Sequence, residues 1–272
     1  MLHTIIIPHR NRNLRLKWCL WSIEESERRT GITDYQVIVV DADSDVEPPM
    51  PERGHVLNAH QIGPLFNKSR MLAVGMALAP KETTVFTFLD ADALVGPQWL
   101  EGVSCLGWHA PTLLFYRVRL LPAQFLSDLE QHADQAVLLY NHWLKDYSRY
   151  VISAEMHATP DQNVRGPQRP PPFGAKVLGN SQLSIRRDVL GDACWDPAYA
   201  GWGHEDKAFI RDVWRRHRGQ YCGAMLTAPE FAMFHVNHPR DLSADDEWFN
   251  EEAVKKNRDL YASTQEPLAC EC

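Results

Sequence analysis

The sequence lacks any apolar run long enough to cross a lipid bilayer, which takes about 20 consecutive residues in a helix. Its opening stretch, MLHTIIIPHR, lacks the basic start and the long apolar segment of a secretory signal peptide. Six cysteines are scattered through 272 residues without the regular spacing of a disulfide framework. We therefore expect a cytoplasmic protein with reduced thiols and no transmembrane segment.

The chain also has no excess of basic residues. It holds 28 Lys and Arg against 35 Asp and Glu, which gives a net charge of −7 at pH 7. This balance argues against nucleic acid or an anionic membrane as a partner. A site for a phosphorylated ligand must then be local, and we expect it to use a metal cation. Hydrophobic residues make up 44% of the chain, which is ordinary for a globular protein able to bury a core.

Short apolar runs alternate with segments of helical periodicity through the first half of the chain, a rhythm typical of a mostly parallel sheet flanked by helices. Leu16, Leu20 and Ile23, for example, share one face of a predicted helix. The pattern predicts strands at residues 4–8, 35–41, 55–59, 83–90, 112–121, 175–185, 221–227 and 230–236, and helices at 14–29, 67–79, 97–106, 123–150, 204–217 and 243–261.

The rhythm breaks at a proline-rich stretch, residues 158–174, of the kind that forms a functional lid or a disordered insertion. The residues after this stretch do not resemble a new domain, so we expect a single α/β domain over residues 1–272. Its parts are a nucleotide-binding half (1–121), an insertion or acceptor-side lid (122–174), an acceptor and catalytic half (175–265) and a tail (266–272).

The letters Asp-Ala-Asp occur twice, each time after a predicted strand, in VIVVDADSD (37–45) and FTFLDADAL (86–94). Residues two apart on an extended backbone point to the same side, so Asp90 and Asp92 can face one Mg²⁺ or Mn²⁺ ion. Taken alone, such a pair is more often a solvated turn. His235 and His238 follow a late strand, and carboxylate with imidazole ligands favours Mn²⁺.

Two other segments carry chemistry-bearing residues. PHRNR (8–12) offers two arginines, whose planar forks pair well with phosphate. GWGHED (201–206) places Trp202 between glycines, where an indole can project and stack on a sugar. Glu205 and Asp206 follow at a predicted helix start. The helix N-terminus alone could account for two carboxylates there, but their position beside an exposed Trp favours a function.

Together these segments resemble the β-1,4-galactosyltransferase family, which carries IIPFRNR, FNRAKLLNVG, DVD, GGVSALS, GWGGEDDD and a late histidine in this order. The resemblance covers most of residues 4–120 and 175–240. It implies a GT-A fold and an inverting, metal-dependent transfer of a sugar from a UDP-sugar to a glycan. The matching segments here are IIIPHRNR, FNKSRMLAVGMALA, FLDADAL, GNSQLSI, GWGHEDKAFIRDVWRR and HVNH.

Carried over residue by residue, the resemblance assigns roles to many positions. In the nucleotide pocket it places Pro8, His9, Arg10, Arg12, Arg70 and Asp90. As ligands of Mn²⁺ or Mg²⁺ it implies Asp92, His238 and His235. Asp206 becomes the catalytic base with Glu205 beside it, the acceptor meets Trp202, Gly203 and Glu205, and the donor sugar meets Val177 and Asn180.

The sequence departs from the family at several positions. His9 replaces an aromatic residue and His204 a glycine, so we expect a different acceptor pocket. Val177 stands roughly where the family has a tyrosine, which leaves room for an N-acetyl group and makes GalNAc a candidate beside Gal. VIVVDADSD resembles the VVVDDGSTD stretch of family-2 glycosyltransferases, which implies that Asp41 meets the uracil side of the nucleotide. A purely local turn is an equal alternative.

Two other functions stay open at this point. A metal-dependent nucleotide-sugar hydrolase needs a water-activating base at the metal, whereas Trp202 and Asp206 favour an organic acceptor. A non-catalytic binding module has no need of a carboxylate at Asp206. The acceptor, the linkage and the oligomeric state do not follow from the sequence.

Overall fold

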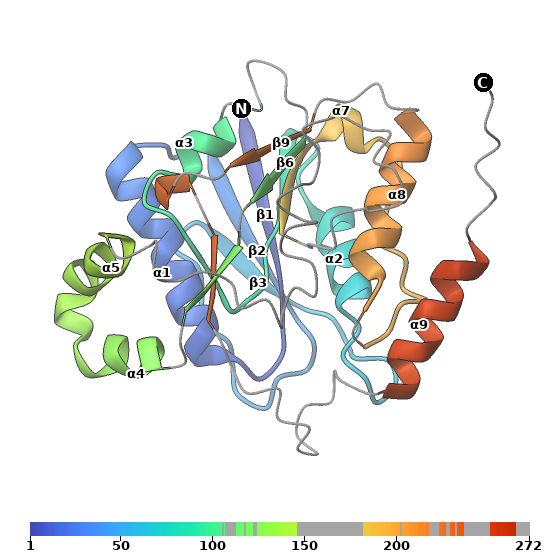
Figure 1. Cartoon of the computed structure of the whole chain (residues 1–272), viewed down its shortest axis with the longest axis horizontal. Coiled ribbons are helices and arrows are strands. Elements are labelled where there is room, and N and C mark those ends of the chain that lie inside the picture. The colour runs from blue at the N-terminus through green and yellow to red at the C-terminus, as the bar shows by residue number, and fades with distance from the viewer. Residues whose placement is uncertain are drawn as a thin grey trace.

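The computed structural model describes residues 1–104, 106, 113–116, 118–121, 124–145, 182–201, 203–217, 223–226, 229–231, 233–236 and 251–264. A central sheet separates two groups of helices (Figure 1). The strands are β1 (Leu2–His9), β2 (Tyr35–Asp41), β3 (Gly54–Asn58), β4 (Thr83–Phe88), β5 (Ala93–Val95), β6 (Leu113–Tyr116), β7 (Val118–Leu121), β8 (Leu183–Arg186), β9 (Gly223–Leu226) and β10 (Met233–Val236).

Helices connect most of these strands. They are α1 (Asn13–Thr30), α2 (Lys68–Leu78), α3 (Trp99–Ser104), α4 (Gln124–Gln131), α5 (Ala136–Lys145), α7 (Arg187–Leu190), α8 (Glu205–His217) and α9 (Glu251–Ser263), with short 3₁₀ turns η2 (Ala133–Gln135) and η4 (Pro229–Phe231). None of the helices in the described ranges is both long and apolar enough to span a membrane.

The main sheet has the order β3-β2-β1-β4-β8-β6-β9. Strands β3, β2, β1 and β4 run parallel, β8 is antiparallel to both of its neighbours, and β6 pairs with β9 in parallel. The apolar run in β1 is buried because both faces of the sheet are covered: Ile5, Ile6 and Ile7 have no exposed surface. The expected mostly parallel α/β architecture is confirmed.

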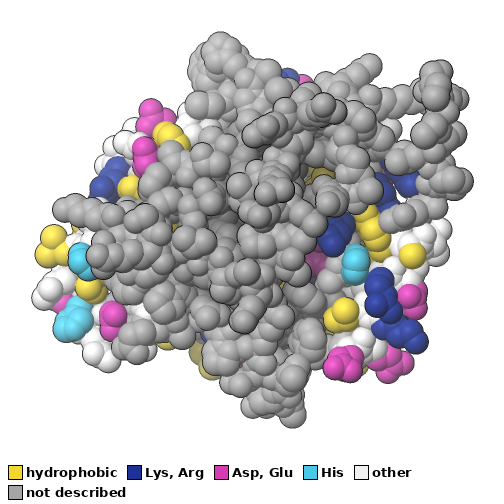
Figure 2. Space-filling model, viewed as in Figure 1, with side chains coloured by type: hydrophobic (Ala, Val, Ile, Leu, Met, Phe, Trp, Pro, Cys, Tyr) yellow, Lys and Arg dark blue, Asp and Glu magenta, His cyan; other side chains and the backbone are white. Residues whose placement is uncertain are grey.

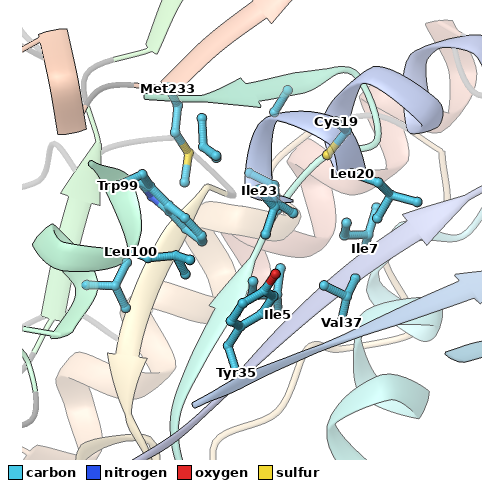
Figure 3. Close-up of a cluster of buried hydrophobic side chains, with 14 of the residues drawn as sticks. Ile5, Ile7, Cys19, Leu20, Ile23, Tyr35, Val37, Trp99, Leu100 and Met233 are labelled. Carbon is cyan, nitrogen blue, oxygen red and sulfur yellow. The ribbon is translucent and has the colours of Figure 1, made fainter. Parts of the chain in front are cut away.

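One face of the sheet packs against α1 and α3. Leu16, Leu20 and Ile23 of α1 are all buried in this cluster, which confirms the helical face expected from their spacing. Trp99 of α3 fills the space beside Met233 of β10, and Ile5 and Ile7 of β1 lie beneath α1 (Figure 3).

The other face packs against α2 and α8, with Trp195 stacked on Phe209 at a ring distance of 4.3 Å. Helix α2 approaches β1 closely at Gly75, where an added Cβ would lie 2.4 Å from Ile6 Cγ2. A larger side chain at this position would push α2 away from the sheet. Asn67 caps the helix by accepting a hydrogen bond from the Arg70 backbone N–H at 2.9 Å.

A second, small sheet has the order β5-β10-β7. The single strand expected over residues 112–121 is wrong. Its first part, β6, pairs with β8 and β9 in the main sheet, whereas β7 pairs with β10 in the small one. Antiparallel pairing of β10 with β5 sets His235 opposite Ala93, directly after the second Asp-Ala-Asp.

The helical region expected at 123–150 forms α4, η2 and α5 over residues 124–145. They pack through Phe125, Leu129 and Tyr140 against Trp18 of α1, on the α1 side of the molecule (Figure 1). Residues 146–181, which include the proline-rich stretch, lie outside the described residues. The expected closing helix is present as α9, from Glu251 to Ser263.

Candidate active site

The loops that carry the predicted site residues follow neighbouring strands. Strand β1 lies between β2 and β4, and all three run parallel, so their carboxyl ends reach the same edge of the sheet. Residues 9–12, 41–45 and 89–92 therefore meet there. This is the edge at which open α/β sheets bind ligands.

Asp92 lies at the centre of this edge. Its side chain is buried, and its Oδ2 accepts a hydrogen bond from Arg12 Nη1 at 2.8 Å. His235 Nε2 lies 3.4 Å from the same oxygen. Burial acts to lower the pKa of His235, but the neighbouring Asp92 outweighs it, so the pKa is raised. The strand end, the Arg12 loop and β10 thus converge on one carboxylate.

Asp90 meets a different set of polar groups. Lys68 Nζ, from the first turn of α2, forms an ion pair with its Oδ1, and Gln182 Nε2 lies 3.3 Å from its Oδ2. Neither Lys68 nor Gln182 was predicted from the sequence. Lys68 belongs to the FNKSR segment, from which Arg70 was predicted instead. Arg70 donates from Nη1 to the backbone oxygen of His60, in the loop after β3.

Glu205 and Asp206 form an acidic pair at the start of α8. Glu205 is buried, and its Oε2 accepts a hydrogen bond from the Gly203 backbone N–H at 2.9 Å. Burial, with the nearby Asp206, raises the pKa of Glu205 to about 7. Burial also raises the pKa of Asp206. Lys68 partly opposes the rise of both pKa values, so this lysine interacts electrostatically with the acidic pair as well as with Asp90.

The turn before the acidic pair has unusual backbone geometry. Gly201, Gly203 and His204 have φ values of 74°, 108° and 68°, and His204 adopts this left-handed conformation despite its side chain. Its imidazole stacks on Tyr261 of α9, with ring centroids 5.3 Å apart. Asn257 of the same helix donates from Nδ2 to the Ala200 backbone oxygen at 3.0 Å. Helix α9 therefore holds this turn.

Tyr261 is also covered by a cation. The Arg211 guanidinium lies 4.1 Å from its ring centroid and donates from Nη1 to its backbone oxygen. On the face drawn in Figure 2, basic and acidic side chains lie together over α9. Exposed members of this helix include Lys255, Lys256 and Arg258.

The first Asp-Ala-Asp is arranged differently from the second. The Asp41 carboxylate is 3% exposed and accepts hydrogen bonds from His9 and Ser44. Burial acts to raise the pKa of Asp41, but these hydrogen bonds outweigh it, and the pKa is lowered. Asp43 is exposed, has a φ of 53°, and accepts a hydrogen bond from the Gln61 backbone N–H at 2.7 Å.

The other predicted residues fall partly within the described ranges. Pro8 lies near the end of β1, paired with Val40, and Arg10 is in the loop after this strand. The structure thus brings together Arg12, Asp90, Asp92, His235 and, through Lys68, Glu205 and Asp206. Trp202, His238, Val177 and Asn180 lie outside the described residues.

The donor set around Asp92 fits a divalent cation. A carboxylate and an imidazole face each other there, a combination suited to Mn²⁺, and the Arg12 guanidinium on the same carboxylate oxygen would have to give way to the ion. Within the described ranges, no three His, Cys, Asp or Glu side chains are grouped closely enough to hold a metal ion. Asp92 and His235 are the residues that would hold it, together with the predicted His238.

No protein-family model and no curated protein matches the sequence. Solved structures do resemble the chain. The TarS fragment 1–349 of S. aureus with UDP-GlcNAc has a TM-score of 0.57 at 12% identity, covering 97% of this chain and 66% of that one. The mannosyltransferase PcManGT of Pyrobaculum calidifontis, with GDP-Man and Mn²⁺, has a TM-score of 0.54 at 15% identity, covering 88% and 58%.

A third structure, the catalytic domain of Drosophila β-1,4-galactosyltransferase 7 with xylobiose, has a TM-score of 0.48 at 15% identity, covering 94% of this chain and 79% of that one. The chain spans less than two thirds of the length of the TarS fragment and of PcManGT. At these identities the likeness establishes the architecture. The chain has the GT-A fold, the α/β fold of nucleotide-sugar glycosyltransferases.

Proposed function

We propose that the chain is an inverting, metal-dependent glycosyltransferase that moves Gal or GalNAc from a UDP-sugar to a hydroxyl of a glycan. One observation carries the proposal. Asp90 and Asp92 are paired with cations at a sheet edge, and Lys68, the partner of Asp90, also interacts electrostatically with a second carboxylate pair, Glu205 and Asp206. A transferase needs these two parts side by side, one for the nucleotide diphosphate and one for the attacking hydroxyl.

The donor side consists of cations at the strand ends. Arg12 is held against Asp92, and its planar guanidinium, with five N–H donors, is the type of side chain that pairs best with the oxygens of a diphosphate. Asp92 would bind the cation that accompanies the diphosphate, with His235 and the predicted His238, and Asp90 would lie beside the ribose and this cation. When bound, Mn²⁺ supplies Lewis acidity that stabilises the negative charge of the departing UDP.

The acceptor side consists of the acidic pair. A general base must lie within hydrogen-bond reach of the hydroxyl it deprotonates, and its pKa is best near the working pH. Burial raises the pKa of both carboxyl groups, that of Glu205 to about 7, and so makes each a stronger base than an exposed carboxylate. We assign the base to Asp206 and acceptor binding to Glu205, Gly203 and Trp202. Asp206 removes the proton as the hydroxyl attacks opposite the departing UDP, and this in-line attack inverts the anomeric centre.

Two of the similar structures support a nucleotide sugar as donor. TarS was solved with UDP-GlcNAc and PcManGT with GDP-Man, so each binds a sugar on a nucleoside diphosphate. Neither identifies the donor of this chain. The choice of Gal or GalNAc rests on the resemblance to the β-1,4-galactosyltransferases and on the small side chain of Val177.

The test is a panel of UDP-Gal, UDP-GalNAc, UDP-GlcNAc and GDP-Man with Mn²⁺, with UDP or GDP release measured with and without candidate acceptor glycans. Acceptor-dependent release from UDP-Gal or UDP-GalNAc is the expected result. Equal release without any acceptor would identify a hydrolase instead. Binding without turnover of any donor across a broad acceptor set would indicate a binding module.

A further inference from the structure

The carboxylate of Asp41 points into the protein rather than toward a ligand. Its Oδ1 accepts hydrogen bonds from His9 Nδ1 at 2.7 Å and from Ser44 Oγ at 2.5 Å, and its Oδ2 accepts from the Ser44 backbone N–H at 3.0 Å. Both oxygens are therefore occupied by protein donors. A carboxylate in this state is poorly placed to hydrogen-bond a nucleobase.

His9 connects Asp41 to Arg12. Its imidazole is 1% exposed, and its Nε2 accepts a hydrogen bond from the Arg12 backbone N–H at 3.2 Å. A nitrogen that accepts carries no proton, so the hydrogen of the neutral ring is on Nδ1 and is donated to Asp41. Asp41 thus fixes both the tautomer and the orientation of His9.

Arg12 completes the connection. Its backbone N–H is held by His9, and its side-chain Nη1 donates to Asp92 Oδ2 at 2.8 Å. The backbone between His9 and Arg12 turns tightly, and Asn11 has a φ of 51°. The Asn11 side chain donates from Nδ2 to the Asp45 carboxylate and accepts at Oδ1 from the Asp45 backbone N–H. The loop that holds Arg12 is thereby fixed to the loop after β2.

We propose that Asp41 and His9 are positioning residues that set the Arg12 guanidinium against Asp92 and so link the two Asp-Ala-Asp segments through one buried hydrogen-bonded relay. This inference rests on the proposed function, because its consequence is the shape of the site that binds the nucleotide diphosphate. It assigns Asp41 a role other than a wall of the uracil pocket.

The same residue types form an instructive pair outside the relay. Asp43 Oδ1 lies 3.1 Å from His60 Nδ1, so a carboxylate again meets an imidazole in the same loop region. Both of these side chains are exposed, and the other oxygen of Asp43 accepts from the Gln61 backbone rather than from a residue of the relay. A substitution of His60 is therefore the matched control for one of His9.

Two His9 variants separate the contact of His9 with Asp41 from its contact with the Arg12 backbone. In His9→Asn, the amide nitrogen takes the place of Nδ1 and still donates to Asp41, but nothing accepts from the Arg12 N–H. In His9→Gln, the longer side chain brings an amide oxygen to the place of Nε2, but the donor to Asp41 is lost. UDP affinity with Mn²⁺ is measured by calorimetry, and thermal stability is recorded for each variant.

His9→Asn is expected to weaken UDP binding about tenfold and to raise the donor KM by the same factor, because one hydrogen bond that positions Arg12 is lost. The acceptor KM and kcat stay within about twofold of the wild type. His9→Gln keeps the acceptor for the Arg12 N–H but loses the Asp41 contact that orients it, so we expect lower thermal stability and an intermediate, about threefold loss of UDP affinity. His60→Gln leaves UDP affinity and stability unchanged.

The proposal is overturned if His9→Asn binds UDP like the wild type, or if His60→Gln weakens binding equally. It also fails if His9→Asn lowers kcat and both affinities alike, which is the mark of a general loss of structure. Nitrogen NMR of the wild-type imidazoles tests the relay without a nucleotide or a variant that must fold. The hydrogen is expected on His9 Nδ1, and a hydrogen on Nε2 would refute the relay. Absence of UDP binding in the wild type would instead refute the proposed function.

Discussion

The two Asp-Ala-Asp segments share three letters and follow strands that both flank β1, yet their carboxylates meet different partners. Asp41 and Asp43 contact groups that hold neighbouring loops, namely His9, Ser44, His60 and Gln61. Asp90 and Asp92 instead face cations and polar groups from distant parts of the chain, namely Arg12, Lys68, Gln182 and His235. The partners that the fold places beside a carboxylate at a strand end therefore determine what that carboxylate can do.

This difference has a physical basis in charge. Asp41 receives hydrogen bonds from neutral groups of its own loop and of His9, at the end of β1. These hydrogen bonds favour the charged carboxylate and hold the two segments together. Asp90 and Asp92 lie beside Lys68 and Arg12, so this edge of the sheet carries both charges. Its carboxylates can bind a cation, and its basic side chains can bind the anionic groups of a ligand. Substitutions in the two segments and in the acidic pair can test this division of labour.

The largest effect is expected from Asp206→Asn, which removes the proposed base and leaves the donor side intact. We expect kcat to fall about 10²- to 10⁴-fold, the range typical of a lost general base, while UDP still binds with Mn²⁺. Steady-state transfer assays and calorimetry measure the two quantities. Asp212→Asn, on the same helix and paired with Arg216, is the control. Retained transfer in Asp206→Asn would refute the base assignment.

Next in size is the loss of metal-dependent binding in the second Asp-Ala-Asp. Asp92→Ala is expected to abolish the Mn²⁺-dependent part of UDP binding, because this buried carboxylate is the proposed ligand and the partner of Arg12. Asp43→Ala should leave Mn²⁺ affinity largely intact. Titration of Mn²⁺ in the presence of UDP distinguishes them, and the reverse result would assign the metal to the first segment.

A stability effect is expected from the acidic pair. A carboxyl whose pKa rises from 4.5 unfolded to about 7 folded binds its proton more tightly in the folded protein. Its contribution to stability is therefore full below pH 4.5 and is lost as the pH rises through about 7. Glu205→Gln should remove this dependence and raise the free energy of unfolding at pH 8 by roughly 1–3 kcal/mol.

Urea unfolding between pH 4 and pH 8 measures this difference. Glu82→Gln, at an exposed position before β4, is the matched control and should follow the wild-type curve. A Glu205→Gln curve parallel to that of the wild type would mean that Glu205 does not carry the raised pKa.

The smallest effect is expected at the contact between α9 and the turn before the acidic pair. Tyr261→Ala removes the ring that stacks on His204, and we expect kcat/KM for the acceptor to fall about two- to fivefold. Tyr261→Phe keeps the ring and should behave like the wild type. Donor affinity should not change in either variant. A change in donor affinity as large as that for the acceptor would show that α9 supports both sides.

The sequence predicted the parts of the fold whose cause is local. The run at Ile5–Ile7 had to be a buried strand, and the spacing of Leu16, Leu20 and Ile23 had to be one helical face. The stretch 112–121 was mispredicted as one strand, because its apolar pattern does not say that β6 joins one sheet and β7 another.

The same distinction applies to the site. Asp90, Asp92, His235 and the acidic pair stood out because their residue types carry chemistry at element ends. Lys68 and Gln182 were missed because a lysine in a first helical turn and a glutamine beside a strand are usually solvated. Only the packing of α2 on β1 and the pairing of β8 with β4 bring them to Asp90. The sequence also could not show that both oxygens of Asp41 accept hydrogen bonds from the protein, since this depends on the ring orientation of His9.

The hold of α9 on the turn at residues 200–204 also bears on how the protein is made. Asn257 reaches back 57 positions to the Ala200 carbonyl, and Tyr261 reaches back to His204. During synthesis strands β1 to β4 leave the ribosome first and can pair while the rest is still being translated. The turn that carries the acidic pair gains its support only after residue 261 has emerged. We therefore expect the acidic pair to be among the last parts of the molecule to reach its final position.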